Sequence, residues 1–187
     1  MQNQPTPPTK PQITALHRRQ TSIREPSRDG VSKARERGWE PFVIPTDASR
    51  RWIDVDALVK DVPVAIDHRD ADDDERLPAP DAVAVVPATF NTLTAWANGT
   101  ANTYPLVKLC AALGARVPTV AVPFAKHDLA GHPAWLASLA VLRYAGVQLI
   151  DPSSGAIGAV EPVESGTGAA VTAAFSWSWV LDRLSAE

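Results

Sequence analysis

The chain has 187 residues, 45% of them hydrophobic, and a formal net charge of -3. This length predicts one domain with a sizeable core, and the near-neutral charge argues against a surface built for nucleic acid. No apolar run reaches the roughly 18 to 20 residues that span a bilayer. The polar, Pro-rich start is unlike a signal peptide, so we expect a cytoplasmic protein with no membrane partner. The single cysteine, Cys110, excludes an internal disulfide, and its apolar neighbours predict a buried structural thiol.

The N-terminal part of the chain is polar and basic. Residues 1–11 are Pro-rich and predict a disordered tail. We interpret residues 1–37 as an atypical, poorly ordered basic segment that precedes an α/β domain at 38–187. A solvated, partly helical surface segment is favoured over a basic arm that binds nucleic acid, because acidic residues are interleaved with the basic ones. The basic residues of this segment are Arg18, Arg19, Arg24, Arg28, Lys33, Arg35 and Arg37.

From Gly38 onward, short apolar runs alternate with helical patterns. Strands are predicted at 39–44, 62–66, 82–86, 117–123 and 147–150. Helices are predicted after Ser49, over 90–113 with one break at Asn98-Gly99, over 135–144 and over 169–184. Thr46 or Asp47 is the expected N-cap of the first helix. Strands that alternate with helices in this way predict an α/β sandwich with a mostly parallel sheet.

The run 82–86 is continuous, short and rich in Val, which is typical of a strand buried on both faces. Ligands of open α/β sheets bind at the carboxyl ends of the strands. The turn that follows, 87–92, supplies two hydroxyls, one side-chain amide and the free N–H groups of a helix start. These groups suit an anion or a polar heterocycle. The alternative, which the residues leave open, is that Thr89 or Asn91 is an ordinary N-cap.

Other polar residues are open to two interpretations. The cluster 98–103 either places side-chain amides near a site or forms an ordinary loop between two helices. Thr46 and Ser49 follow the first predicted strand and would lie at the same edge of the sheet. The histidines show no metal-ligand spacing, so no metal site is predicted, and only His68 is placed where it could point at the site.

The segment 87–92, Pro-Ala-Thr-Phe-Asn-Thr, followed by 96–102, Trp-Ala-Asn-Gly-Thr-Ala-Asn, resembles a family motif. That motif is similar to P-A-S/T-x-N-T followed by Gly-x-Ala-Asp. It belongs to the flavoprotein family of homo-oligomeric flavin-containing cysteine decarboxylases, which includes phosphopantothenoylcysteine decarboxylase and the lantibiotic decarboxylases. Segments 43–53 and 120–123 look like other strands of that family, and the resemblance covers roughly 38–150.

The resemblance implies a three-layer, flavodoxin-like Rossmann sandwich that binds FMN, acts on a small molecule and assembles as a homo-oligomer, usually a trimer or a multiple of one. Asn91 would meet flavin or substrate and is the candidate catalytic residue. Thr46 would lie near the FMN phosphate or ribityl chain, and Asn replaces the family's Asp at Asn102. The residues that the resemblance assigns to cofactor binding are Thr46, Ala88, Thr89, Asn91, Thr92, Ala101 and Asn102.

The chain departs from the family pattern at three places. Residues 12–28 show neither the apolar first strand nor its Gly/Ser phosphate loop, so we predict that the first strand is missing or replaced. The decarboxylase histidine is unmatched at 72–74, and the substrate-recognition motif P-x-M-N-x-x-M-W is unmatched at 123–130. Two functions follow: an FMN-binding flavoprotein that acts on an unknown small molecule, or a non-catalytic homologue that serves as a binding or regulatory subunit.

Overall fold

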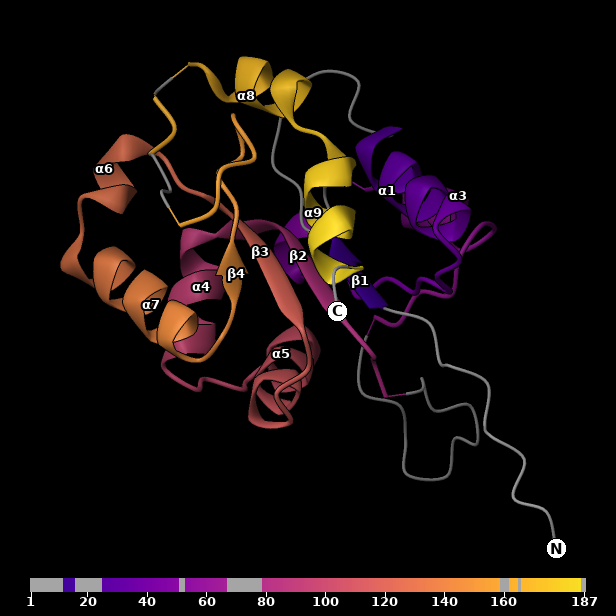
Figure 1. Ribbon diagram of the computed structural model, residues 1–187, viewed down its shortest axis with the longest axis horizontal. Helices are drawn as coiled ribbons and strands as arrows, with labels where there is room; N and C mark the ends of the chain where they lie inside the picture. Colours follow the sequence, from indigo (N-terminus) through magenta and orange to yellow (C-terminus); the bar gives the residue numbers. More distant parts are fainter. Residues whose placement is uncertain are drawn as a thin grey trace, which may run out of the picture.

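A computed structural model describes residues 12–15, 25–50, 53–66, 79–158, 162–164 and 166–185 of the chain. Within them, four parallel strands form one sheet in the order β1-β2-β3-β4 (Figure 1). The strands are β1 (Gln12–Ala15), β2 (Val83–Thr89), β3 (Thr119–Phe124) and β4 (Gln148–Leu149). The helices are α1 (Glu25–Glu36), α2 (Asp47–Arg50), α3 (Val55–Leu58), α4 (Phe90–Ala97), α5 (Tyr104–Gly114), α6 (His127–Ala130), α7 (Pro133–Tyr144), α8 (Gly168–Ala174) and α9 (Trp177–Leu184).

Helices cover both faces of the sheet, which gives the three layers that the sequence predicted. One core lies between the sheet and α4, α5, α6 and α7, and it includes Val83 and Val85 of β2. The other core lies between the sheet and helices α1 and α9, and it includes Ala84 and Val86. Successive side chains of β2 therefore enter opposite cores. This is why the run 82–86 is apolar at every position rather than at alternate ones.

The pairing of β2 with β3 changes register once. Val85 lies opposite Ala121, whereas Ala88 lies opposite Pro123, so three steps along β2 match two steps along β3. The Val86–Pro87 peptide bond within this irregular stretch is cis. After the shift, Ala88 belongs to the same core as Val83 and Val85. The shift lies immediately before the turn into α4.

The position of the predicted missing first strand is occupied by β1. This strand pairs in parallel with β2, and Gln12 lies opposite Val83. The prediction that the family's first strand is missing or replaced holds, because the strand at this place is only four residues long and is not a continuous apolar run. A strand of this composition forms because the edge of β2 offers unpaired backbone groups, which a local pattern does not reveal.

The segment that precedes β2 differs from the prediction. The strands predicted at 39–44 and 62–66 are reduced to one parallel bridge between Val43 and Val64. Prolines flank this bridge and cannot donate to a ladder, which limits the pairing. The single helix predicted after Ser49 is instead two short helices, α2 and α3, and Asp54 caps α3 by accepting from the Ala57 N–H at 3.1 Å.

The second half of the chain follows the prediction more closely. The break at Asn98-Gly99 separates α4 from α5, and β3, α7 and β4 lie where strands and helix were expected. The predicted C-terminal helix is divided into α8 and α9, because Ser176 has extended backbone and caps α9 through its contact with the Ser178 N–H. The sequence pattern of this helix predicted Val171, Phe175, Trp179, Val180 and Leu184 to face inward. Trp177 is outside that set and is also buried.

Helix α1 packs onto this α/β body although it precedes the boundary predicted at Gly38. Its Ala34 is buried in the same core as α9. Arg37 forms an ion pair with Asp182 of α9 at 2.7 Å. Two further basic residues of the segment also contact the chain: Lys33 pairs with Asp29 at 2.9 Å, and Arg35 donates to the carbonyl of Asp61. None of the helices in the described ranges is long and apolar enough to cross a membrane.

Cys110 of α5 is half-buried, and its burial raises the pKa of the thiol above the ordinary value. Because the thiolate is the nucleophile, we expect iodoacetamide at pH 8 to alkylate the folded protein more slowly than the urea-unfolded protein. The difference should shrink as the pH rises, since the thiolate then forms in both states. Mass spectrometry of timed samples measures this. Equal rates at pH 8 would contradict an inert, structural Cys110.

Candidate functional site at the end of strand β2

The turn from β2 into α4 gathers the hydroxyl groups that the sequence singled out. Thr89 is the N-cap of α4, and its Oγ1 accepts from the Thr92 N–H at 3.5 Å. The two hydroxyl oxygens, Thr89 Oγ1 and Thr92 Oγ1, lie 3.1 Å apart. Asn91 is exposed on α4 and does not cap the helix. Ala88, Thr89, Asn91 and Thr92 thus lie together at the carboxyl end of β2 and the start of α4.

Aromatic packing fixes the start of α4 against α7. The Phe90 ring stacks on Trp135 with centroids 5.9 Å apart and meets His132 edge-on at 6.1 Å. His132 caps α7, where its Nδ1 accepts from the Ala134 N–H at 3.1 Å. His132 therefore has a structural role. His68 lies outside the described residues, and the described residues include no group of three or more metal-ligating side chains.

Thr46 holds the start of α2. Its Oγ1 accepts from the Ser49 N–H at 3.2 Å, and the buried Ser49 hydroxyl donates to the Thr46 carbonyl at 2.7 Å. The prediction that Thr46 or Asp47 caps this helix is therefore confirmed for Thr46. Both of its hydrogen bonds to Ser49 are local, so they order the backbone that follows Val43 at the Val43–Val64 bridge.

Ala101 and Asn102 lie elsewhere in the chain. They are exposed in the connection between α4 and α5, at the opposite end of α4 from Thr89. An eight-residue helix is about 12 Å long, so one chain does not bring them to the Thr89 turn. Asn98 ends α4 by donating from Nδ2 to the Thr94 carbonyl at 2.7 Å. Within one chain, residues 98–103 therefore form an ordinary loop between two helices, which is the second of the two interpretations given for this segment.

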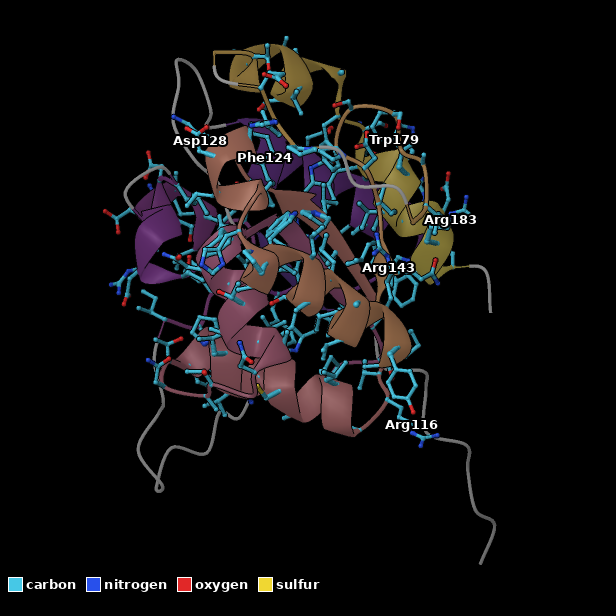
Figure 2. All side chains as sticks on the ribbon, turned by 90° about the vertical axis from the view of Figure 1, so that its left-hand side faces the viewer. Arg116, Phe124, Asp128, Arg143, Trp179 and Arg183 are labelled. Carbon is cyan, nitrogen blue, oxygen red and sulfur yellow. The ribbon has the colours of Figure 1, made fainter. Side chains whose placement is uncertain are left out.

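Two acidic residues that the sequence pattern did not single out, Asp128 and Asp151, follow β3 and β4. Phe124 ends β3 and Asp128 lies in α6, both labelled in Figure 2. Asp151 follows β4 and is buried, and its Oδ1 accepts from the Ser153 N–H, the Ser154 N–H and the Ser154 hydroxyl, each at 2.9 Å. The Asp-Pro-Ser-Ser order after a strand is the local signal of this turn.

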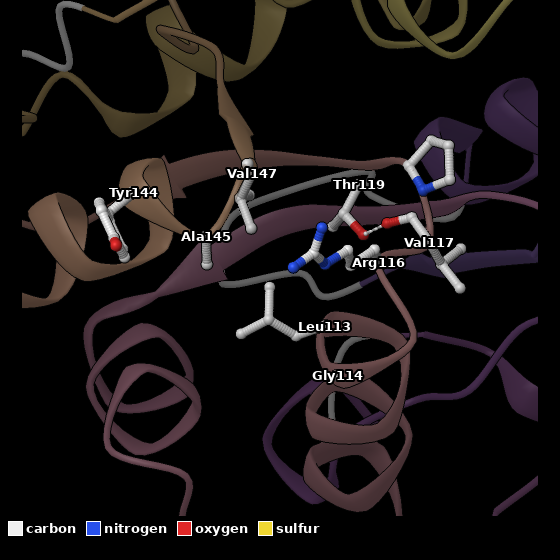
Figure 3. A pocket seen from close by; sticks show the side chains of 10 residues that line it. Leu113, Gly114, Arg116, Val117, Thr119, Tyr144, Ala145 and Val147 are labelled. Atoms are coloured by element: carbon white, nitrogen blue, oxygen red, sulfur yellow. Dashed lines mark hydrogen bonds between the residues drawn. The ribbon is translucent and has the colours of Figure 1, made fainter.

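A pocket of about 590 Å³ lies at the opposite edge of the sheet, where β3 and β4 begin. Its lining residues come from the ends of α5 and α7 and from the chain that enters the strands (Figure 3). The Arg116 side chain extends between Leu113 and Val147 in this pocket, and its backbone has a φ of 57°. This pocket is separate from the Thr89 turn, which lies at the carboxyl edge.

The Thr89 hydroxyl should contribute to stability through its capping role. Thr89→Ala removes the acceptor of the Thr92 N–H, so we expect the free energy of unfolding to fall by about 1 kcal/mol. Thr89→Ser keeps the capping oxygen and is the matched control, with a smaller loss. Urea denaturation of both variants measures the difference. Equal losses in the two variants would show that the methyl group, not the cap, matters.

The sheet order, the two helical layers and a polar turn at the end of a central strand define a flavodoxin-like α/β sandwich. The model of the Flavoprotein family matches residues 12–179, and the chain belongs to this family. A comparison with curated protein sequences gives no significant match.

Solved structures share this fold at low sequence identity. Phenylacrylic acid decarboxylase from Aquifex aeolicus is 17% identical, with a TM-score of 0.64, and the match covers 96% of this chain and 98% of that one. The FMN binding protein AtHal3 is 17% identical, with a TM-score of 0.65, covering 95% and 98%. The FMN-dependent cysteine decarboxylase SpaF is 19% identical, with a TM-score of 0.60, covering 88% and 94%. These likenesses concern the fold.

Proposed function

We propose that this protein binds FMN at the end of β2 and acts on a small molecule. The observation that carries the proposal is the paired hydroxyls of Thr89 and Thr92, 3.1 Å apart at the start of α4, in a chain of the Flavoprotein family. Two of the similar solved structures, AtHal3 and SpaF, are described as FMN-binding or FMN-dependent. The proposal extends that property to this chain.

The residues at the β2–α4 turn fit a flavin by their chemistry. Ala88 is fully buried in the core beneath α4, so it anchors the turn, and only the resemblance assigns it to the cofactor site. The Thr89 and Thr92 hydroxyls, together with the free N–H groups at the start of α4, suit the carbonyl and nitrogen atoms of a polar heterocycle. Bound flavin would supply oxidation–reduction chemistry, and the protein would supply binding and orientation.

Individual roles follow from these positions. Thr89 and Thr92 would hold the ring, and Thr46 would lie toward the ribityl chain or phosphate, as the resemblance implies. Asn91 is exposed next to this turn, so its amide can reach a substrate placed against the flavin. Asn91 is therefore the proposed catalytic residue. The substrate and the cytoplasmic location stay predictions.

Spectroscopy of the purified protein tests the proposal. A yellow preparation with flavin absorption, which releases FMN on denaturation, is the expected result. Thr92→Val keeps the shape of the side chain but removes its hydroxyl, and we expect it to weaken FMN binding about tenfold in a fluorescence titration. Thr172→Val, on α8, is the matched control. A colourless protein that does not take up added FMN would overturn the proposal.

The second candidate is a non-catalytic homologue that serves as a binding or regulatory subunit. It is favoured by the segment 123–130, where the chain runs from the end of β3 into α6 without the Met, Asn and Trp of the decarboxylase motif. Under this alternative, FMN binding without turnover, or no binding at all, is expected. Assays for decarboxylation of cysteine derivatives by FMN-loaded protein distinguish the two candidates.

A further inference from the structure

The pocket at the amino edge of the sheet lies apart from the candidate flavin site and has no role in the proposed function. It is lined by the last turns of α5 and α7 and by the chain that enters β3 and β4 (Figure 3). Its volume of about 590 Å³ is typical of pockets that hold small molecules. Two of its residues, Arg116 and Tyr144, indicate what kind of molecule it binds.

Arg116 has a backbone conformation that favours glycine. Two helix-to-strand turns meet at the pocket and close in the same way. After α5, the Arg116 N–H donates to the Leu113 carbonyl at 3.1 Å, and after α7, the Gly146 N–H donates to the carbonyl three residues earlier at 3.0 Å. Gly146 has a φ of 93°, and Arg116, with a φ of 57°, is the only non-glycine residue with a positive φ in the part of the chain that the structure describes. Because only glycine adopts this region without steric cost, Arg116 costs stability at a place where its side chain enters a pocket.

The Arg116 guanidinium is available to a ligand. Figure 3 shows the side chain extended across the pocket, between Leu113 and Val147, toward the end of α7. Among the described lining residues it is the only charged one, and no ion pair joins it to another described residue. A guanidinium binds a planar anion such as a carboxylate through two parallel N–H donors. An anion in this pocket would therefore meet a cation that no described residue neutralises.

The rest of the lining suits an aromatic ligand with a single negative charge. Leu113 and Val147 provide apolar walls, and Tyr144, which is 95% accessible, offers an almost bare ring. A ligand ring can stack on this ring and on the plane of the guanidinium. Helices α5 and α7 both end at the pocket, and the C-terminus of a helix carries partial negative charge. This charge disfavours a doubly charged phosphate more than a carboxylate beside Arg116.

We propose that this pocket binds a small, planar aromatic monocarboxylate, with the carboxylate on Arg116 and the ring against Tyr144. The inference goes beyond the proposed function. It does not depend on whether FMN is bound, because the two sites lie at opposite edges of the sheet. Binding at this pocket and binding of FMN should therefore be independent of each other.

Calorimetric titration of the full chain with 2-naphthoate tests the proposal. We expect saturable binding of one molecule per chain, which Arg116→Gln weakens at least about tenfold because it removes the charge. Tyr144→Leu keeps an apolar side chain without the ring and should weaken binding about fivefold. Arg183→Gln, at an exposed arginine of α9, is the matched control and should bind like the wild type. Absence of saturable binding, or equal weakening in Arg116→Gln and Arg183→Gln, would overturn the proposal.

Three further measurements test the ligand class, the location and the role of Arg116. At pH 8, the neutral 2-naphthamide and the doubly charged 2-naphthyl phosphate should both bind more weakly than 2-naphthoate, and tighter binding of the phosphate would refute a carboxylate site. Displacement of 2-naphthoate by excess FMN would place it at the carboxyl edge instead. Arg116→Gly should lose binding yet melt at or above the wild-type temperature, because glycine adopts this φ without strain. A melting temperature well below that of the wild type would mean that the side chain stabilises the turn, against the proposal.

Discussion

Replacing Trp96 with alanine is expected to lower the free energy of unfolding by about 3 to 5 kcal/mol, because it empties a large space in the core. Trp96 lies on α4 with 1% of its surface accessible and packs in the core between the sheet and α4, α5 and α7. The surrounding helices and sheet limit how far this space can collapse. Loss of the same packing should also loosen α4, which begins at the candidate site.

Trp96→Phe separates packing from polarity at this position. The indole Nε1 is buried and has no hydrogen-bond partner among the described residues. Phenylalanine fills most of the volume and removes this unsatisfied donor, so we expect a loss below about 1.5 kcal/mol. Urea denaturation of the two variants measures the difference. A loss in Trp96→Phe as large as in Trp96→Ala would mean that the indole N–H has a partner.

The second large effect is expected at Gly30, in the middle of α1. A Cβ at this position would lie 2.4 Å from Cε2 of Trp177 on α9. Trp177 is 3% accessible and cannot move aside freely. Gly30→Ala should therefore destabilise the protein by about 1 to 3 kcal/mol through overpacking. This net loss already includes the gain of roughly 1 kcal/mol that alanine brings to a helix.

A rescue and a control make this prediction specific. Trp177→Leu creates space, so Gly30→Ala should be tolerated better in that background, and a double-mutant cycle reports the coupling. Gly114→Ala is the control, because a Cβ at Gly114 of α5 meets nothing within 4 Å. Additive effects of Gly30→Ala and Trp177→Leu would show that α1 does not pack on α9. Strong coupling would make the segment before Gly38 part of the folded body.

The local sequence pattern predicted an element correctly where the residues that determine the element are neighbours in the chain. The run 82–86 is apolar because both of its faces are buried, and the break at Asn98-Gly99 ends α4 through a side-chain bond that Asn can make. The polar turn at Thr89 was located for the same reason, since its residues follow that strand directly in the sequence.

Where the structure differs from the prediction, contacts between distant segments decide the outcome. β1 exists because the edge of β2 pairs with it, and Trp177 is inward because it meets Gly30 across the layer between α1 and α9. The residues next to β1 and Trp177 in the sequence do not indicate that β1 pairs with β2 or that Trp177 contacts Gly30. The arrangement of Thr46 relative to Thr89 is likewise set by the fold and not by spacing in the chain.

The register shift in β2 reverses the phase of its alternation. Before the shift, the odd-numbered residues Val83 and Val85 enter the core beneath α4, whereas after it the even-numbered Ala88 does. Uninterrupted alternation would have sent Thr89 into that core and left its hydroxyl without water. Removing or adding a single residue between Val85 and Ala88 would place the Thr89 hydroxyl in the core and the Ala88 methyl group outside it. The number of residues between Val85 and Ala88 therefore determines whether the turn presents a hydroxyl or a methyl group.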